Sequence, residues 1–295
     1  MSKKIVVVGG SGFLGSHVAD ELSKRGYKVT IFDKKKSTWI KPGQKMCIGD
    51  ILNPKDLEKA IKGADVVFHF AALSDLGRAL KEPINTVRVN ILGTVLALEL
   101  SRKHNVKRFI HASTIYVNSI DGGFYRSSKK AAEDYVEEYK KNHNLNYTIL
   151  RFGSLYGQRS DDTNGVRIIL KNAIVNGEIS YTGSKKTVRS YIHVIDAAEA
   201  CVNTLKKKYK NEYVIITGKK EIKITIFLKN LSKMLKISKR IKFKNKKIIG
   251  HYETTPFTYK FKRGQIFKHK SNIDIYDGIS QLINEIKNEA NIQKI

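Results

Sequence analysis

A tyrosine and a lysine four residues apart could form a catalytic pair. Tyr125 and Lys129 stand at positions i and i+4, and on a helix these positions share one face about one turn apart. A cation there favours the phenolate, so we expect the phenol pKa to fall from about 10 towards neutrality. Tyr125 could then act as general acid and base on an alcohol, and Lys129 could also reach ribose hydroxyls. Such a pair is common on surface helices, so a catalytic role is indicated only if the surrounding sequence supports one.

Two hydroxyl groups precede this pair. The segment from Phe109 to Ala112 is expected to be a strand, and it ends in Ser113 and Thr114. Hydroxyls at a strand end could hydrogen-bond the same substrate oxygen as a nearby phenol. The residues expected to be catalytic are therefore Thr114, Tyr125 and Lys129.

A glycine-rich turn near the start of the chain could bind phosphate. The apolar run from Ile5 to Val8 has the length of a buried strand and is followed by Gly9, Gly12 and Gly15, then by a helical pattern. In such a turn the first glycine permits the tight bend, the second lets the backbone approach a pyrophosphate, and the third lets helix and strand pack closely. The spacing predicts a dinucleotide site; the alternative is a glycine-rich turn alone.

An acidic residue follows the next predicted strand. Asp33 ends the segment from Lys28 to Phe32 and lies 18 residues beyond Gly15, where a carboxylate can accept from both ribose hydroxyls of an adenosine. Since a carboxylate also repels a 2′-phosphate, we expect NAD rather than NADP as cofactor. The neighbouring Lys34, Lys35 and Lys36 could partly neutralise that repulsion.

These residues belong to an alternation of strands and helices. Through the first two thirds of the chain we expect strands at 5–8, 28–32, 46–48, 65–70, 106–112 and 147–152, and helices from 13 onward and at 54–62, 84–104 and 124–143. Further on we expect a helix at 166–176, strands at 179–181 and 188–193, a helix at 194–206, a strand at 213–216, and helices at 224–235 and 275–288. The order predicts an α/β fold, a Rossmann-type doubly wound parallel sheet with a smaller C-terminal α/β substrate domain.

The charge is strongly positive and unevenly distributed. The formal net charge is +28, and residues 206–295 carry 23 Lys and Arg against 7 Asp and Glu, with nine basic residues and no acidic one between Lys229 and Lys247. A nucleic-acid surface and a solvated face that attracts an anionic small substrate would both explain this. Because no nucleic-acid-binding motif accompanies the charge, we favour the second explanation.

Composition also restricts cofactors and location. Cys47 and Cys201 are too few for a disulfide framework and lack metal-ligand spacing, so no metal is expected. No apolar run approaches the length of a membrane span, and MSKK leaves no room for a cleavable signal before the first strand. We therefore expect a cytoplasmic protein.

Together the motifs resemble the extended short-chain dehydrogenase/reductases, specifically the NAD-dependent nucleotide-sugar epimerase/dehydratase group, over nearly the whole chain. The resemblance lies in eight ordered segments: Gly9–Gly15, Asp50-Ile51, Phe68–Ala72, Asn90–Thr94, Ser113–Val117, Tyr125–Glu133, Arg151–Gly157 and Arg189–Ala198. It implies cofactor contacts at Gly9, Gly12, Phe13, Leu14, Gly15, Asp33, Asp50, Ile51, Phe70, Ala71, Ala72, Asn90, Ser113, Tyr125 and Lys129. It also implies substrate contacts at Ser154 and at Arg189, the latter with a diphosphate. The alternative for Arg189 is a surface residue at the start of a strand with no role in binding.

The chain also departs from the group's pattern. Ser154 stands where the group has Asn, and the interval from Thr114 to Tyr125 is short. Most 4,6-dehydratases of the group have Asp-Glu directly after the catalytic Thr, whereas this chain has Ile115 and Tyr116. Neither cysteine lies near the site, which excludes the arrangements of the 3,5-epimerases. Redox chemistry at a single carbon remains.

The resemblance therefore implies a nucleotide-sugar 4-epimerase that forms a transient 4-keto sugar, in the supply of sugars for surface polysaccharides. One alternative is a 4-ketoreductase or dehydrogenase of the same fold; a more distant one is a non-catalytic NAD-binding protein whose basic lobe engages a partner. Residues 1–155 would bind the dinucleotide, with 188–212 returning to that domain, and 156–295 would mainly bind the nucleotide sugar. A homodimer through the helices at 84–104 and 124–143 is also implied.

Three aromatic residues have less specific expectations. We expect His69 and His193 to pack or hydrogen-bond rather than to shuttle protons. Trp39 follows the Asp33 strand and could either cover the adenosine or pack on the surface.

Overall fold

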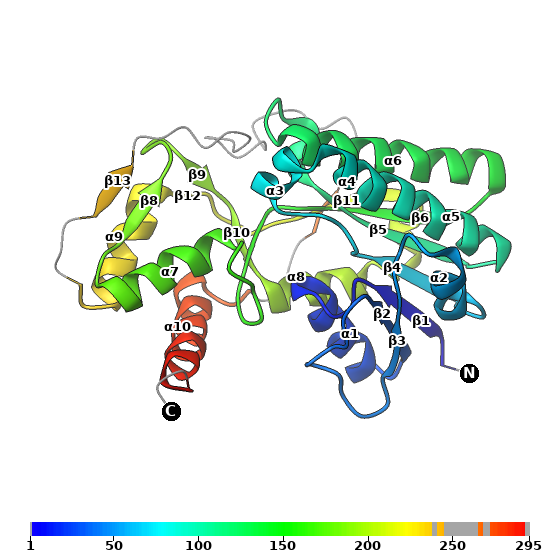
Figure 1. The fold of residues 1–295 in the computed structure, drawn as a ribbon, viewed down its shortest axis with the longest axis horizontal. Coiled ribbons are helices and arrows are strands. Elements are labelled where there is room, and N and C mark those ends of the chain that lie inside the picture. Colours follow the sequence, from blue (N-terminus) through cyan, green and yellow to red (C-terminus); the bar gives the residue numbers. More distant parts are fainter. Residues whose placement is uncertain (1, 238–240, 245–264, 268–271, 293–295) are drawn as a thin grey trace.

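The structure is a computed structural model that describes residues 2–237, 241–244, 265–267 and 272–292. It has a large lobe, which contains both the first strand and the longest helix, and a smaller lobe at the opposite end of the molecule (Figure 1). The basic stretch noted above lies only partly within this range, because residues 238–240 and 245–247 are outside the described residues.

A parallel sheet of eight strands forms the centre of the large lobe. Its order is β14-β11-β6-β5-β4-β1-β2-β3, and every neighbouring pair is parallel. The strands are β1 (Lys4–Val8), β2 (Lys28–Asp33), β3 (Lys45–Ile48), β4 (Val66–His69), β5 (Arg108–Thr114), β6 (Tyr147–Phe152), β11 (Glu212–Ile216) and β14 (Gln265–Ile266). The chain runs outward from β1 in one direction and returns to β4 on its other side, so a crevice opens at the carboxyl ends of the strands. The predicted fold class is confirmed.

Helices cover both faces of this sheet. On one face lie α1 (Phe13–Lys24) and α8 (Val194–Asn203), and on the other α2 (Pro54–Ile61), α5 (Gly93–Lys103) and α6 (Gly123–His143). Along β1, Ile5 and Val7 join the core on the α1 side, and Val6 and Val8 join the core on the α6 side. A strand buried on both faces has to be apolar throughout, which explains its unbroken run of hydrophobic residues.

The helix expected at 84–104 is not continuous. It consists of α4 (Pro83–Val87), a π-helical turn (Arg88–Leu92) and α5, and it is preceded by α3 (Leu76–Lys81), which the sequence did not predict. A π-turn widens the helix locally and is frequent at functional sites.

Within the described residues, the smaller lobe contains α7 (Gly165–Asn176), α9 (Ile224–Met234), α10 (Ile275–Ile292) and three two-stranded sheets. These sheets pair β7 (Ser154–Tyr156) with β10 (Tyr191–His193), β8 (Ser180–Thr182) with β13 (Lys242–Lys244), and β9 (Val188–Arg189) with β12 (Ile222–Lys223). The single strand expected at 188–193 is therefore wrong: it breaks at Ser190 because its halves pair with different partners. The helix expected at 194–206 ends at Asn203, and the terminal helix extends beyond the expected residue 288.

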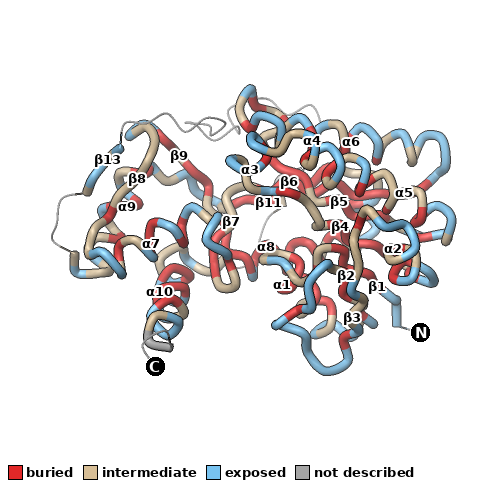
Figure 2. The backbone as a smooth tube through the Cα atoms, in the orientation of Figure 1, coloured by how far each residue is buried: buried red, intermediate tan, exposed pale blue. Residues whose placement is uncertain are grey.

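Buried residues concentrate along the central sheet and on the inner sides of α7, α9 and α10 (Figure 2). The small-lobe core contains Phe227 and Leu231 of α9 with Ile279 and Leu282 of α10. Among the described residues, no helix has the length and apolar character that crossing a membrane requires. In the same part of the chain, His, Cys, Asp and Glu side chains form no group of three that could bind a metal.

Candidate active site

A large cleft lies at the carboxyl ends of the sheet strands, with a volume of about 1590 Å³. It extends from the glycine turn after β1 to the outer face of α7. Most of the residues expected to act line it: Gly9, Gly12, Phe13, Leu14, Gly15, Asp33, Ile51, Phe70, Ala71, Ala72, Ser113, Thr114, Tyr125, Lys129, Ser154 and Arg189. Asp50 and Asn90 are not part of the lining.

The glycine turn is too tight for side chains at three of its positions, Gly9, Gly10 and Gly15. Gly9 has a φ of 82°, and a Cβ there would lie 2.5 Å from the Ala71 nitrogen. A Cβ on Gly15 would lie 2.2 Å from the Gly9 oxygen, whereas one on Gly12 would only approach that oxygen to 3.3 Å. α1 begins directly after Gly12 without a side-chain cap, so its first N–H groups are left for an anion.

Asp33 is held at the end of β2 by two backbone groups. Its carboxylate accepts from the Ser11 N–H at 3.0 Å and from the Lys35 N–H at 3.2 Å. The Lys34 ammonium lies 2.9 Å from a carboxylate oxygen of Asp50. Lys34, one of the three lysines that could neutralise the charge of Asp33, is therefore paired with Asp50 instead.

Asn90 lies behind the cleft wall, in the π-turn. Its amide oxygen accepts from the Leu73 N–H at 2.7 Å, and its amide nitrogen donates to the Leu73 oxygen at 3.0 Å and to the Ser128 hydroxyl at 2.9 Å. Asn90 is fully buried. Asn90 therefore does not line the cofactor side of the cleft. Its bonds to Leu73 and Ser128 instead hold the segment after Ala72 against α6, the helix that carries Lys129.

The predicted catalytic residues meet at one place. Thr114 ends β5, and Tyr125 and Lys129 project from α6 into the same cleft. Burial raises the pKa of Tyr125 to about 12, opposed by a hydrogen bond with the Thr114 hydroxyl. Burial lowers the pKa of Lys129 to about 8, opposed by the charge of Glu133. The predicted lowering of the Tyr125 pKa is therefore wrong for the protein without bound ligands. Burial disfavours the charged phenolate by more than the expected attraction to the Lys129 ammonium would favour it.

A buried ion pair supports this helix and was missed in the sequence. Arg151 of β6 donates from Nε to Glu133 at 3.0 Å and from Nη2 at 2.7 Å, and its guanidinium lies 4.2 Å from the centre of the Tyr213 ring. Glu133 is completely buried, whereas the neighbouring acids Asp134 and Glu138 on the same helix are exposed. The position of Glu133 four residues after Lys129 could have indicated a role beside that lysine, because positions i and i+4 share one face of a helix.

The remaining predicted residues take distinct places. Arg189 is buried in β9 and donates to the Val188 oxygen at 2.9 Å, and Ser154 begins β7. Burial lowers the pKa of His69 to about 3 and that of His193 to about 4, so both rings are neutral near pH 7. The Trp39 ring lies 4.8 Å below the Arg159 guanidinium and outside the cleft lining, which favours the packing role.

Comparison with known proteins decides the family. The model of the NAD dependent epimerase/dehydratase family matches residues 5–216. The chain belongs to this family. A putative UDP-glucose 4-epimerase of Methanocaldococcus jannaschii is 28% identical over 96% of the chain and 98% of the relative. A UDP-N-acetyl-alpha-D-glucosaminuronate decarboxylase of Bacillus cytotoxicus is 28% identical over 82% of the chain and 83% of the relative. The fold is similar to that of a UDP-glucuronic acid 4-epimerase of Bacillus cereus in complex with UDP-glucuronic acid and NAD, with 24% identity, a TM-score of 0.82, and 97% and 99% of the two chains covered.

This member of the epimerase/dehydratase family is an NAD-dependent enzyme, and its residues fit the cofactor. The turn at Gly9 and Gly15 forms a cradle that a Cβ would fill, and the start of α1 offers N–H groups to a pyrophosphate. The Ser113 hydroxyl is buried at the end of β5, and no hydrogen-bond partner for it occurs among residues 2–237, 241–244, 265–267 and 272–292. Asp33, already fixed by backbone N–H groups, has the carboxylate that a ribose requires.

Proposed function

We propose that this enzyme is a nucleotide-sugar 4-epimerase that acts through a transient 4-keto sugar. The observation that carries the proposal is the meeting of Thr114, Tyr125 and Lys129 at the end of β5, with no carboxylate on β5 or α6 in the described lining. The 4-epimerases among the similar proteins support it.

Tyr125 would move the proton. Its hydroxyl is hydrogen-bonded to Thr114, so both groups can bind one substrate oxygen, the 4-hydroxyl of the sugar. Only as the phenolate could Tyr125 take the proton from this oxygen and return it when the alcohol re-forms, so the positive charges of Lys129 and of the bound cofactor would have to lower the pKa that burial alone raises to about 12. Lys129, protonated below a pH of about 8, brings a positive charge to the same helix face. NAD supplies, when bound, reversible hydride acceptance at one carbon.

The carboxylates of the described lining belong to elements other than β5 and α6. They are Asp33, Asp75, Asp161 and Asp162. Asp33 is at the cofactor end, Asp75 caps α3 by accepting from the Arg78 N–H at 2.6 Å, and the other two belong to the loop before α7. The position after Thr114 is Ile115, which is buried. None of these carboxylates stands on β5 or α6, the elements that carry Thr114, Tyr125 and Lys129, which favours epimerisation over dehydration.

We further propose a nucleoside diphosphate sugar as the substrate class. Cations line the outer part of the cleft at Lys171, Arg189 and Lys244, which suits a diphosphate. The Arg189 side chain is buried at the cleft wall, and a guanidinium there can hold two phosphate oxygens at once.

We also propose that the enzyme acts as a homodimer. Apolar side chains are exposed on the helices expected to form the interface, at Ile84, Val87 and Leu92 of the segment 84–104 and at Tyr135 of α6. Exposed apolar side chains on neighbouring helices are typical of a protein interface.

The test is to incubate the purified enzyme separately with UDP-glucose and UDP-galactose and to follow the anomeric proton by NMR. Interconversion with no net change in NADH absorbance supports the proposal. Steady consumption of NADH with a 4-keto sugar would instead identify a 4-ketoreductase. Tight NAD binding without turnover of any nucleotide sugar would favour a non-catalytic role.

A further inference from the structure

The loop of residues 157–164 joins β7 to α7 and forms one wall of the cleft. Four of its residues line the cleft: Asp161, Asp162, Thr163 and Asn164. The loop has its own internal bonds, since Asp161 accepts from the Thr163 N–H at 3.0 Å and the Asn164 amide donates to the Leu155 oxygen at 2.8 Å. These bonds fix its shape, and Gln158 and Arg159 carry its contacts with α1 of the large lobe.

On the side of the large lobe, Arg159 reaches α1. Its Nη2 donates to Asp20 at 2.8 Å, its guanidinium covers the Trp39 ring, and the oxygen of the preceding Gln158 lies 3.1 Å from His17 Nε2. The Arg159 and Asp20 side chains are only 16% and 14% exposed, so salt screens this pair less than a surface pair. Because α1 begins at the glycine turn, these contacts tie the loop to the helix that would face the cofactor.

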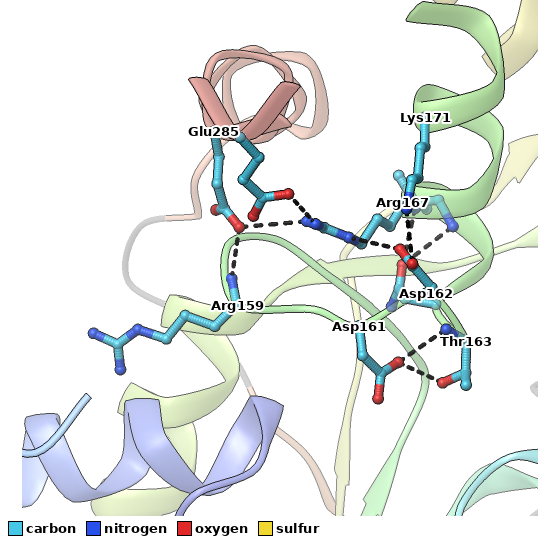
Figure 3. A network of polar contacts seen from close by, with 10 residues as sticks. Arg159, Asp161, Asp162, Thr163, Arg167, Lys171 and Glu285 are labelled. Carbon is cyan, nitrogen blue, oxygen red and sulfur yellow. Dashed lines mark hydrogen bonds and ion pairs between the residues drawn. The ribbon is translucent and has the colours of Figure 1, made fainter. Parts of the chain in front are cut away.

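On the side of the small lobe, the same residue is held by α10. Glu285 accepts from the Arg159 N–H at 3.2 Å and from Arg167 Nη1 at 3.4 Å. Arg167 also donates to Asp162 at 3.3 Å and pairs with Glu289. Figure 3 shows Glu285 reaching from α10 to both arginines, while the Arg159 side chain extends away from this network.

The backbone at Arg159 has an uncommon conformation for a residue with a long side chain. Its φ is 63°, a left-handed conformation that glycine adopts at no steric penalty and that most other residues avoid. In this conformation the Arg159 side chain bonds to Asp20 of the large lobe, and its backbone N–H bonds to Glu285 of the small lobe. We propose that Arg159 and Glu285 are positioning residues that set the distance between the substrate loop 157–164 and the cofactor helix α1.

This inference rests on the proposed function where it takes a nucleotide sugar as the ligand of the loop. In the NAD-loaded full chain, Arg159→Ala should raise the KM for the UDP-sugar about tenfold, as for loss of a charge-assisted hydrogen bond. The dissociation constant of NAD and kcat should change far less. Amide hydrogen exchange across residues 157–165 should become faster. Arg159→Lys keeps the charge near Asp20 without the planar fork and should restore part of the wild-type behaviour.

Two further variants make the test specific. Glu285→Gln preserves side-chain size, weakens the α10 contacts only, and should also accelerate exchange at 157–165. Lys107→Ala removes an exposed ion pair with Asp65 at the opposite end of the sheet strands, so it serves as the matched control and should leave KM and exchange unchanged.

Exchange at 157–165 as slow as in the Lys107→Ala control, in both Arg159→Ala and Glu285→Gln, would overturn the inference. So would faster exchange with an unchanged KM, because the loop would then not position substrate. Should Arg159→Ala fail to fold, Glu285→Gln decides alone. The exchange measurement needs no substrate, so a wild-type enzyme that does not epimerise UDP-sugars would refute the proposed function without deciding this inference.

Discussion

Lys129 should make the enzyme less stable than it would be without this charge. The side chain is buried at the foot of the cleft, and burial lowers its pKa from 10.5 to about 8, partly opposed by Glu133. A shift of this size corresponds to roughly 3 kcal/mol, at about 1.4 kcal/mol for each pKa unit. Replacing Lys129 with Met keeps most of the side-chain length and removes the buried charge.

The pH dependence gives this prediction its sign. The unfolded chain keeps the Lys129 proton up to a pH of about 10.5, but the folded chain keeps it only up to about 8. Below pH 8 the penalty for the buried charge is fully present; between pH 8 and 10.5 the unfolded state binds more protons, so the contribution of Lys129 to stability becomes less unfavourable. The stability advantage of Lys129→Met over wild type should thus be roughly 3 kcal/mol larger at pH 7 than at pH 10.5.

Guanidinium unfolding followed by circular dichroism at pH 7, 8, 9 and 10.5 measures this difference. An exposed substitution, Lys107→Met, is the control and should show almost no pH-dependent difference from wild type. A stability difference between Lys129→Met and wild type that stays constant over this pH range would refute the reasoning. The variant should also lose activity, so stability and catalysis would move in opposite directions.

Four other outcomes are expected. Tyr125→Phe should lower kcat by about two to four orders of magnitude while NAD still binds, as measured by turnover and by titration with the cofactor. Asp33→Ala should narrow the preference for NAD over NADP, as shown by the two dissociation constants. Arg189→Ala should raise the KM for the nucleotide sugar about ten- to hundredfold with little effect on NAD affinity, and Arg189→Lys should recover only part. Ile84→Glu combined with Leu92→Glu should convert a dimer into monomers in analytical ultracentrifugation, since the patch they occupy would carry repelling charges.

The sheet and the glycine turn could be predicted because their signals are local. Four apolar residues, a glycine turn and a helical pattern follow one another directly at Ile5–Gly15, and the same alternation recurs as far as β6. Element ends were less predictable: the break at Ser190 depends on β7 and β12, which lie at distant points of the sequence.

Buried charges were not predictable for a similar reason. The pattern of α6 places Glu133 beside exposed acids, and only its contact with Arg151 of β6 shows why it is buried. The pKa of Tyr125 depends on how completely water is excluded, which the spacing of Tyr125 and Lys129 does not encode. Arg159 likewise gains its two anchors from α1 and α10, helices at opposite ends of the chain.

Because α10 lies at the end of the sequence, it affects the order in which a newly synthesised chain acquires its two binding sites. This helix supplies Glu285 to the substrate loop and Ile279 and Leu282 to the small-lobe core, yet ribosomes make it long after the glycine turn and the strands β1 to β6. N-terminal parts of a protein generally fold first during synthesis. A nascent chain is therefore expected to acquire its dinucleotide lobe first and to seat the substrate loop only once α10 has emerged, so cofactor capture would precede sugar recognition during biogenesis.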